Sequence, residues 1–153
     1  MQTSKSAFTM IELIFVIVIL GVLAAVAIPK IAVTRTDAQI ATTAQNIVTG
    51  AGEIAAYAVS NGTTQSDLSV MSNAVEIMVN NGSTVINTVN KTAIIQFGSI
   101  VDCVSIQVVT GLNDDNLTIT FGNGVGDSKC LGLQSKIDAQ QYPMQLRGGL
   151  VKE

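Results

Sequence analysis

The strongest constraint on this chain is a continuous apolar run close to its N-terminus. The run extends from Phe8 to Ile28, and in these 21 residues only Thr9 and Glu12 have polar side chains. A helix of this length rises 1.5 Å per residue and is about 31 Å long, which matches the ~30 Å hydrocarbon core of a bilayer. The run therefore predicts a helix that lies in a membrane or among other apolar helices.

Two common targeting segments explain this run incompletely. A cleaved secretory signal has an apolar region of only about 7–15 residues, although Ala24, Ala25 and Ala27 imitate its cleavage site. A plain signal anchor has the right length but leaves Glu12 unexplained, because a carboxylate in hydrocarbon costs roughly 2.5–3.5 kcal/mol. We expect Glu12 to lack a partner within a lone helix, so the sequence points to a partner outside it.

The composition argues against catalysis and against nucleic-acid binding. The chain has no His, which excludes a Ser-His-Asp triad and every His-ligated metal site, and its two Cys cannot build a Cys₄ site alone. A net charge of −3 and a pI near 4.7 leave no basic surface for phosphates. We therefore predict a non-enzyme with no cofactor and no nucleic-acid partner.

A motif around Glu12 gives the run a more specific meaning. The stretch Lys5-Ser6-Ala7-Phe8-Thr9-Met10-Ile11-Glu12-Leu13, which continues to Ile28-Pro29-Lys30, resembles the N-terminus of type IV pilins and type II secretion pseudopilins. In that family a prepilin peptidase cuts before the Phe and methylates its new amine. The resemblance implies a cut between Ala7 and Phe8. The family usually has Gly before the cut, whereas Ala7 stands here and is small enough for a tight protease subsite.

The resemblance also implies a role for Glu12, which becomes the fifth residue of the mature chain. Cleavage leaves a free amine on Phe8 at the membrane boundary, and the Glu12 carboxylate can pair with that amine on a neighbouring subunit. Two desolvated charges that are each costly alone become favourable when paired, so this pairing would drive assembly. The alternative is a partly hydrated carboxylate that reaches back to the interface.

The helical pattern continues beyond the apolar run. An apolar stripe at helical spacing predicts one helix from Phe8 to Ser60, with Pro29 kinking it. The stripe consists of Val33, Ile40, Ala44, Ile47, Ala51, Ile54 and Ala58, and Asp37 interrupts it. A second helix is predicted from Ser66, its cap, to Asn80, with Met71 and Met78 as core residues.

The second half of the chain predicts a small sheet. Thr92–Phe97, Val101–Thr110 and Asn116–Phe121 are rich in Val, Ile, Thr and Phe, which favours three antiparallel strands. A short helix is predicted within Lys129–Ile137, and no structure is assigned to Tyr142–Glu153. The expected fold class is α+β: a long N-terminal helix packed against a small antiparallel β-sheet head, as in pilins.

Three further groups of residues are candidate sites in this head. Cys103 and Cys130 should form a disulfide if the head is exported, as in the C-terminal region of many type IV pilins; the alternative is two buried thiols. Asp114, Asp115 and Asp127 are weak candidates for a calcium site, although no EF-hand spacing is present. Asn116 begins an Asn-Leu-Thr sequon with Asp114 two residues before it, which makes it a weak glycosylation candidate.

The resemblance implies the following organisation and function. Residues 1–7 form a cleaved leader, residues 8–30 the transmembrane and fibre-core half of the helix, and residues 31–153 a periplasmic or extracellular head. The chain is a structural subunit of a type II secretion pseudopilus or type IV pilus, anchored in the bacterial inner membrane before it polymerises. Its partners are further copies of itself, prepilin peptidase, the assembly platform and minor pilins or pseudopilins. The alternative is a signal-anchored periplasmic binding module that does not polymerise.

Overall fold

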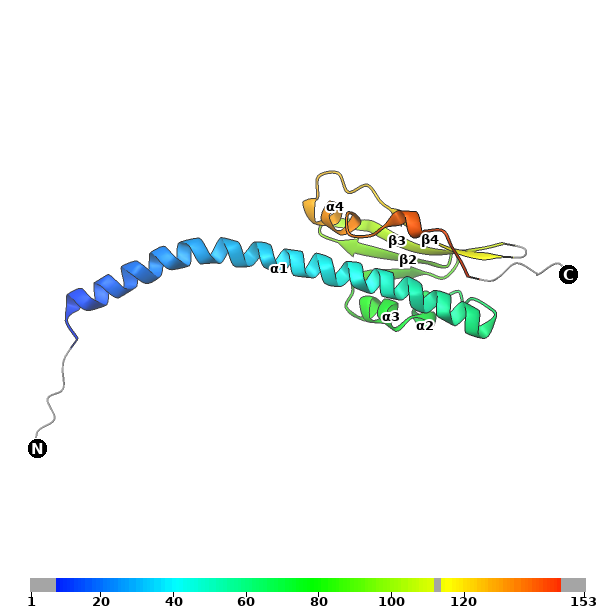
Figure 1. Ribbon diagram of the computed structural model, residues 1–153, viewed down its shortest axis with the longest axis horizontal. Helices are drawn as coiled ribbons and strands as arrows, with labels where there is room; N and C mark the ends of the chain where they lie inside the picture. Colours follow the sequence, from blue (N-terminus) through cyan, green and yellow to red (C-terminus); the bar gives the residue numbers. More distant parts are fainter. Residues whose placement is uncertain (1–7, 112–113, 147–153) are drawn as a thin grey trace, which may run out of the picture. The chain divides into compact units, whose positions relative to one another are not determined.

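A computed structural model describes residues 8–111 and 114–146, with the side chains of residues 28–33 excepted (Figure 1). The predicted leader, residues 1–7 including Ala7, lies outside the described residues. The chain divides into two compact units, Met1–Ala38 and Gln39–Glu153. We call the second unit the head. Helix α1, Met10–Asn61, contributes its first part to one unit and its second part to the head.

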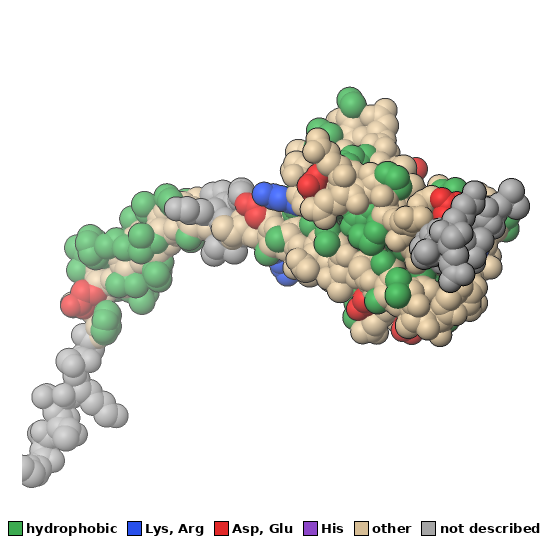
Figure 2. Space-filling model, turned by 45° about the vertical axis from the view of Figure 1, so that its right-hand side comes forward, with side chains coloured by type: hydrophobic (Ala, Val, Ile, Leu, Met, Phe, Trp, Pro, Cys, Tyr) green, Lys and Arg blue, Asp and Glu red, His purple; other side chains and the backbone are tan. Residues whose placement is uncertain are grey.

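The first part of α1 is apolar on every side. The segment Met10–Ala27 has a mean hydropathy of 2.9 and none of it is buried within the chain. Figure 2 shows hydrophobic side chains over the visible face of this part of the helix. A helix from Phe8 to Ser60 is confirmed with small shifts of its ends, and α1 continues through Pro29 as helix. The kink at Pro29 stays a prediction.

The second part of α1 presents one apolar face to the core of the head. The predicted stripe is confirmed from Ile40 onward, where its side chains are buried, and Asp37 is exposed. The side chain of Val33, the first predicted member, lies outside the described residues. The buried members are Ile40, Ala44, Ile47, Ala51, Ile54 and Ala58. Figure 1 shows this part of α1 alongside the sheet. The 3.6-residue period of the sequence thus defines the face that packs.

The sheet of the head is an antiparallel meander with the strand order β1-β2-β3-β4-β5. Its strands are β1 Thr84–Asn87, β2 Thr92–Phe97, β3 Ile100–Thr110, β4 Asp115–Phe121 and β5 Met144–Gln145. The three predicted strands are confirmed as β2, β3 and β4. The edge strands β1 and β5 were not predicted, because four and two residues are too few to show a period of two. The face toward α1 buries Ala93, Ile95, Val104, Ile106, Val108, Leu117 and Ile119.

The single predicted helix from Ser66 to Asn80 is wrong. Two helices, α2 Leu68–Met71 and α3 Asn73–Asn80, replace it, because Ser72 adopts an extended conformation between them. Asp67, and not Ser66, caps α2, while Ser72 caps α3 with its hydroxyl. The predicted core role of the two methionines, Met71 and Met78, is confirmed by their burial.

The chain between β4 and β5 forms two short helices. Helix α4, Ser128–Gln134, begins one residue before the predicted segment Lys129–Ile137 and ends within it, and a 3₁₀ helix η1 follows at Ala139–Gln141. Each of the two helices has an aspartate as its N-cap: Asp127 caps α4 and Asp138 caps η1. Leu133 and Ile137 join the hydrophobic core of the head from this segment.

Candidate functional site

The N-terminal end of α1 is closed by a pair of side chains one turn apart. The Thr9 backbone N–H and hydroxyl both donate to Glu12 Oε2, at 2.8 and 2.7 Å. The Glu12 backbone N–H donates back to the Thr9 hydroxyl at 3.3 Å. This is the reciprocal arrangement of a capping box, in which Thr caps the helix and Glu stands three residues later.

The prediction that Glu12 lacks a partner within its own chain is therefore wrong. The partner is local, because Thr-x-x-Glu before an apolar run is the sequence signature of a capping box. The two hydrogen bonds that Thr9 donates to the Glu12 carboxylate are both accepted by Oε2. Among the residues that the structure describes, the other oxygen of Glu12 has no hydrogen-bond partner and can accept from a group outside the chain.

The surroundings of the capping box are exposed and apolar. Phe8, the predicted new N-terminus, is 78% exposed. Fourteen large hydrophobic side chains between Phe8 and Val26 are each at least 42% exposed. Monomeric soluble proteins do not leave such a surface in water. This end of α1 therefore requires lipid or other apolar helices around it.

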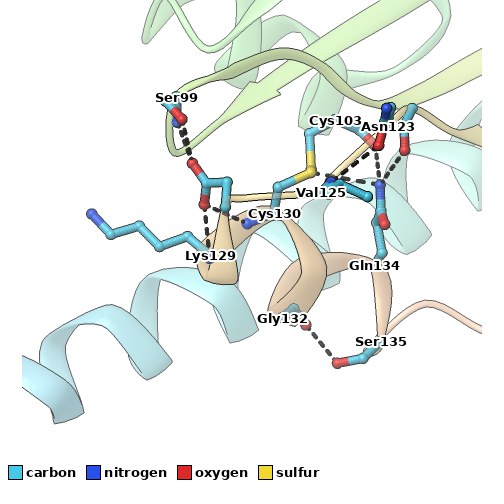
Figure 3. The surroundings of a disulfide bond; sticks show 11 residues. Ser99, Cys103, Asn123, Val125, Lys129, Cys130, Gly132, Gln134 and Ser135 are labelled. Carbon is cyan, nitrogen blue, oxygen red and sulfur yellow. Dashed lines mark hydrogen bonds between the residues drawn. A yellow bond between two sulfur atoms is a disulfide. The ribbon is translucent and has the colours of Figure 1, made fainter.

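The second candidate site is the disulfide in the head, which the structure confirms. The sulfur atoms of Cys103 and Cys130 lie 2.02 Å apart, and their Cα atoms are separated by 5.8 Å (Figure 3). Both residues are fully buried. The bond joins strand β3 to helix α4 across 27 positions of sequence.

Asp127 binds two separate elements beside this disulfide. Its Oδ1 accepts from the N–H groups of Lys129 and Cys130, at 2.8 and 3.1 Å, and so caps α4. Its Oδ2 accepts from the N–H and hydroxyl of Ser99, at 2.6 and 2.7 Å, in the turn between β2 and β3. The Ser99 donors, followed by the α4 N–H groups, hold the pKa of Asp127 well below its ordinary value of 3.8.

Gln134 makes a second polar connection next to the disulfide. Its side-chain N–H₂ donates to the Cys103 carbonyl at 2.8 Å and to the Gly122 carbonyl at 2.9 Å. The same nitrogen lies 3.5 Å from the Cys130 sulfur (Figure 3). The last residue of α4 is thus bound to the backbone of β3 and to the residue that follows β4.

The three calcium candidates are not brought together. Asp114 and Asp115 lie where β3 passes into β4, and Asp115 is buried and accepts from the Thr64 hydroxyl at 2.9 Å. Asp127 lies beside Ser99, at the opposite end of β3. An 11-residue strand is about 35 Å long, too far for shared ligation. No cluster of three or more His, Cys, Asp or Glu side chains occurs in the described parts of the chain.

Asn116 lies within the sheet. It belongs to β4, where it pairs with Val109 of β3 and Gln145 of β5. Its side chain is half-buried, and its amide lies 3.4 Å from Asp114 Oδ2. Its glycosylation stays a prediction.

Comparison with known proteins places the motif at the N-terminus. Residues 2–28 match the model of the prokaryotic N-terminal methylation motif. No curated protein and no solved structure matches the chain. The match covers the predicted cleavage point, the capping box and the exposed apolar helix. The chain carries, at residues 2–28, the N-terminal methylation motif that is the signature of pilins and pseudopilins.

Proposed function

We propose that this protein is a structural subunit of a helical fibre, either a type II secretion pseudopilus that supports protein secretion or a type IV pilus. The observation that carries the proposal is the coincidence of two features near the start of the described chain. The methylation motif matches residues 2–28, and within this match Met10–Ala27 form a helix with hydrophobic side chains exposed all around it. A helix of this kind suits a bilayer first and the centre of a fibre afterwards.

Maturation proceeds by cleavage and methylation. Prepilin peptidase cuts between Ala7 and Phe8 and methylates the amine of Phe8. Before extraction, the precursor spans the inner membrane once, with its head in the periplasm. The assembly platform and minor pilins or pseudopilins then incorporate the mature subunit into the fibre. Phe8 is well exposed ahead of α1, as a processing site must be.

Glu12 directs the assembly of the fibre. Thr9 occupies one carboxylate oxygen of Glu12 and leaves the other available, so the carboxylate is held at a fixed place on the helix. The available oxygen accepts from the methylated amine of Phe8 on a neighbouring subunit. A carboxylate and an amine in an apolar medium are each costly alone and favourable together, which selects subunits in register.

The test replaces Glu12 and measures fibre formation and membrane insertion separately. Glu12→Val should abolish fibres recovered from the cell surface or periplasm, while the chain still accumulates in the membrane fraction. Glu76→Gln is a matched control, because it removes an exposed carboxylate on α3 and should assemble normally. Wild-type amounts of fibre from the Glu12→Val chain would remove the main support for polymerisation.

Mass spectrometry of the mature N-terminus tests the maturation step independently. The expected chain begins at an N-methylated Phe8. A membrane-bound chain that keeps Met1 would contradict processing and would favour the alternative, a signal-anchored binding module that does not polymerise.

A further inference from the structure

We propose that Asp127 and Gln134 are positioning residues for the disulfide. They hold α4 on the sheet when the cysteines are reduced, and they thereby place the Cys130 thiol against Cys103. The disulfide then forms in a head that is already folded, and does not itself bring α4 to the sheet. This inference concerns the folding of the head and does not depend on the proposed fibre.

The first argument is the geometry of Asp127. Its carboxylate divides its two oxygens between two elements, with Oδ1 on the first turn of α4 and Oδ2 on Ser99. The hydrogen bond from the Cys130 N–H, at 3.1 Å, fixes the backbone of one of the two cysteines directly. An ionised acceptor forms stronger hydrogen bonds than a neutral one. Asp127 is therefore a link between α4 and the β2–β3 turn that contains no sulfur.

The turn itself is shaped to admit this carboxylate. Gly98 has a φ of +65°, and a Cβ atom at that position would collide with the Asp127 side chain. Glycine satisfies both demands, because it adopts positive φ without strain and leaves the space empty.

The second argument is Gln134, at the other end of α4. Its amide bridges the carbonyls of Cys103 and Gly122, so it fixes the backbone of the second cysteine. Asp127 and Gln134 thus bind one cysteine each through backbone groups. With Leu133 fully buried between them in sequence, α4 has an apolar anchor as well.

The chemical step is a thiol–disulfide exchange with an external disulfide, such as glutathione disulfide or a disulfide oxidoreductase. The two cysteine S–H bonds and the S–S bond of the oxidant break, and one protein S–S bond forms. The protein loses two electrons and two protons, and the oxidant leaves as two thiols. The docking of α4 on the sheet and the formation of the disulfide favour each other by the same factor. Contacts that stabilise the docked α4 therefore raise, by that factor, the effective concentration of the Cys130 thiol at Cys103.

The experiment equilibrates the full chain, in detergent micelles, with glutathione buffers and measures the effective concentration of the cysteine pair. Asp127→Ser keeps a helix cap but cannot reach Ser99, and should lower this value about tenfold, after allowance for partial exposure. Asp138→Ser is the matched control, because Asp138 caps η1 outside the disulfide loop and should change the value less than twofold. Ser99→Ala, a milder change, should lower it roughly threefold.

Two further measurements separate positioning from general stability. Val75→Ala removes core volume between α1 and α3, so it should lower the unfolding free energy and leave the effective concentration unchanged. The double variant Cys103→Ser, Cys130→Ser should retain slow hydrogen exchange at the Leu131 and Ser135 amides, whose bonds to Asp127 and Leu131 carbonyls form α4. Equal values for Asp127→Ser and Asp138→Ser, or unprotected α4 amides in the double variant, would overturn the proposal.

Discussion

Removal of the Glu53 carboxylate should loosen the start of α3 from α1 within the head. Glu53 lies on α1 and its Oε2 accepts from the Ser72 hydroxyl at 2.7 Å and from the Ala74 N–H at 2.9 Å. Ser72 in turn accepts from the Val75 N–H at 3.0 Å and caps α3. One carboxylate thus anchors the start of α3 to the long helix.

The magnitude follows from these contacts. Each hydrogen bond to an ionised acceptor contributes about 1.5–3 kcal/mol, and partial exposure of Glu53 and the ordering of its side chain reduce the sum. Glu53→Ala also leaves the hydroxyl of Ser72, which is 2% exposed, without its acceptor. We expect a loss of about 2 kcal/mol in the free energy of unfolding at pH 7. Glu53→Gln keeps one acceptor oxygen and should lose about half as much.

The assay is urea unfolding of the full chain in detergent, followed by circular dichroism. With a slope of about 1.5 kcal/mol per molar urea, the Glu53→Ala midpoint should fall by about 1.3 M. Glu76→Gln, an exposed carboxylate on α3, should leave the midpoint within about 0.3 M of wild type. A Glu53→Ala midpoint equal to that of Glu76→Gln would refute the anchoring role.

The pH dependence gives a second, independent check. The Ala74 N–H, with the Ser72 hydroxyl second, lowers the pKa of Glu53 in the folded chain below its ordinary value of 4.5. A lowered pKa means that the ionised form stabilises the fold above pH 4.5 and that this stability is lost as the pH falls through the folded pKa. The difference between wild type and Glu53→Gln should therefore be constant above about pH 6 and should vanish in acid. A difference that grows in acid would contradict this sign.

Three further outcomes are expected. Thr9→Val removes the hydroxyl that donates to Glu12, so its fibre yield should fall below that of Thr9→Ser, which keeps the hydroxyl; equal yields would contradict a role for the capping box. Ile54→Ala, at a position with no exposed surface, should cost about 3 kcal/mol in urea unfolding, whereas Val59→Ala, at 73% exposure, should cost under about 0.5 kcal/mol. Reduction with dithiothreitol should lower the unfolding free energy by about 3–4 kcal/mol, from the chain entropy of a loop with a separation of 27; an unchanged value would show that the unfolded chain gains nothing from losing the bond.

Periodic parts of the fold could be predicted from sequence because many residues repeat the same signal. The stripe from Ile40 to Ala58 and the three central strands each contain several positions that obey one period, so single exceptions do not hide them. Strands β1 and β5 are too short for such repetition. β5 pairs with β4 through two residue pairs, and its neighbours in space determine it more than its own residues do.

The break between α2 and α3 shows why a local pattern can fail. Leu68, Met71, Val75 and Met78 have helical spacing, and all four are buried as that spacing predicts. The chain nevertheless leaves the helix at Ser72, because Glu53, 19 positions earlier, provides an acceptor for its hydroxyl and for the Ala74 N–H. The helical period of the sequence thus predicts which side chains are buried. It does not predict the break in the backbone, because that break depends on a contact with a residue far away in the sequence.

The roles of Asp127 and Glu12 depend on where each stands relative to a helix start and not on residue type alone. Asp127 is predicted as a possible cation ligand together with Asp114 and Asp115, yet α4 begins directly after it at Ser128, one residue before the predicted helical segment, and Asp127 is its N-cap. Four N–H and O–H donors now surround its carboxylate, and a cation at the same oxygens would have to displace them. Glu12 follows the same logic, since Thr9 three positions earlier completes a capping box. In both cases the position relative to a helix start decides the role of the carboxylate, and that position can be read from sequence once the helix itself is recognised.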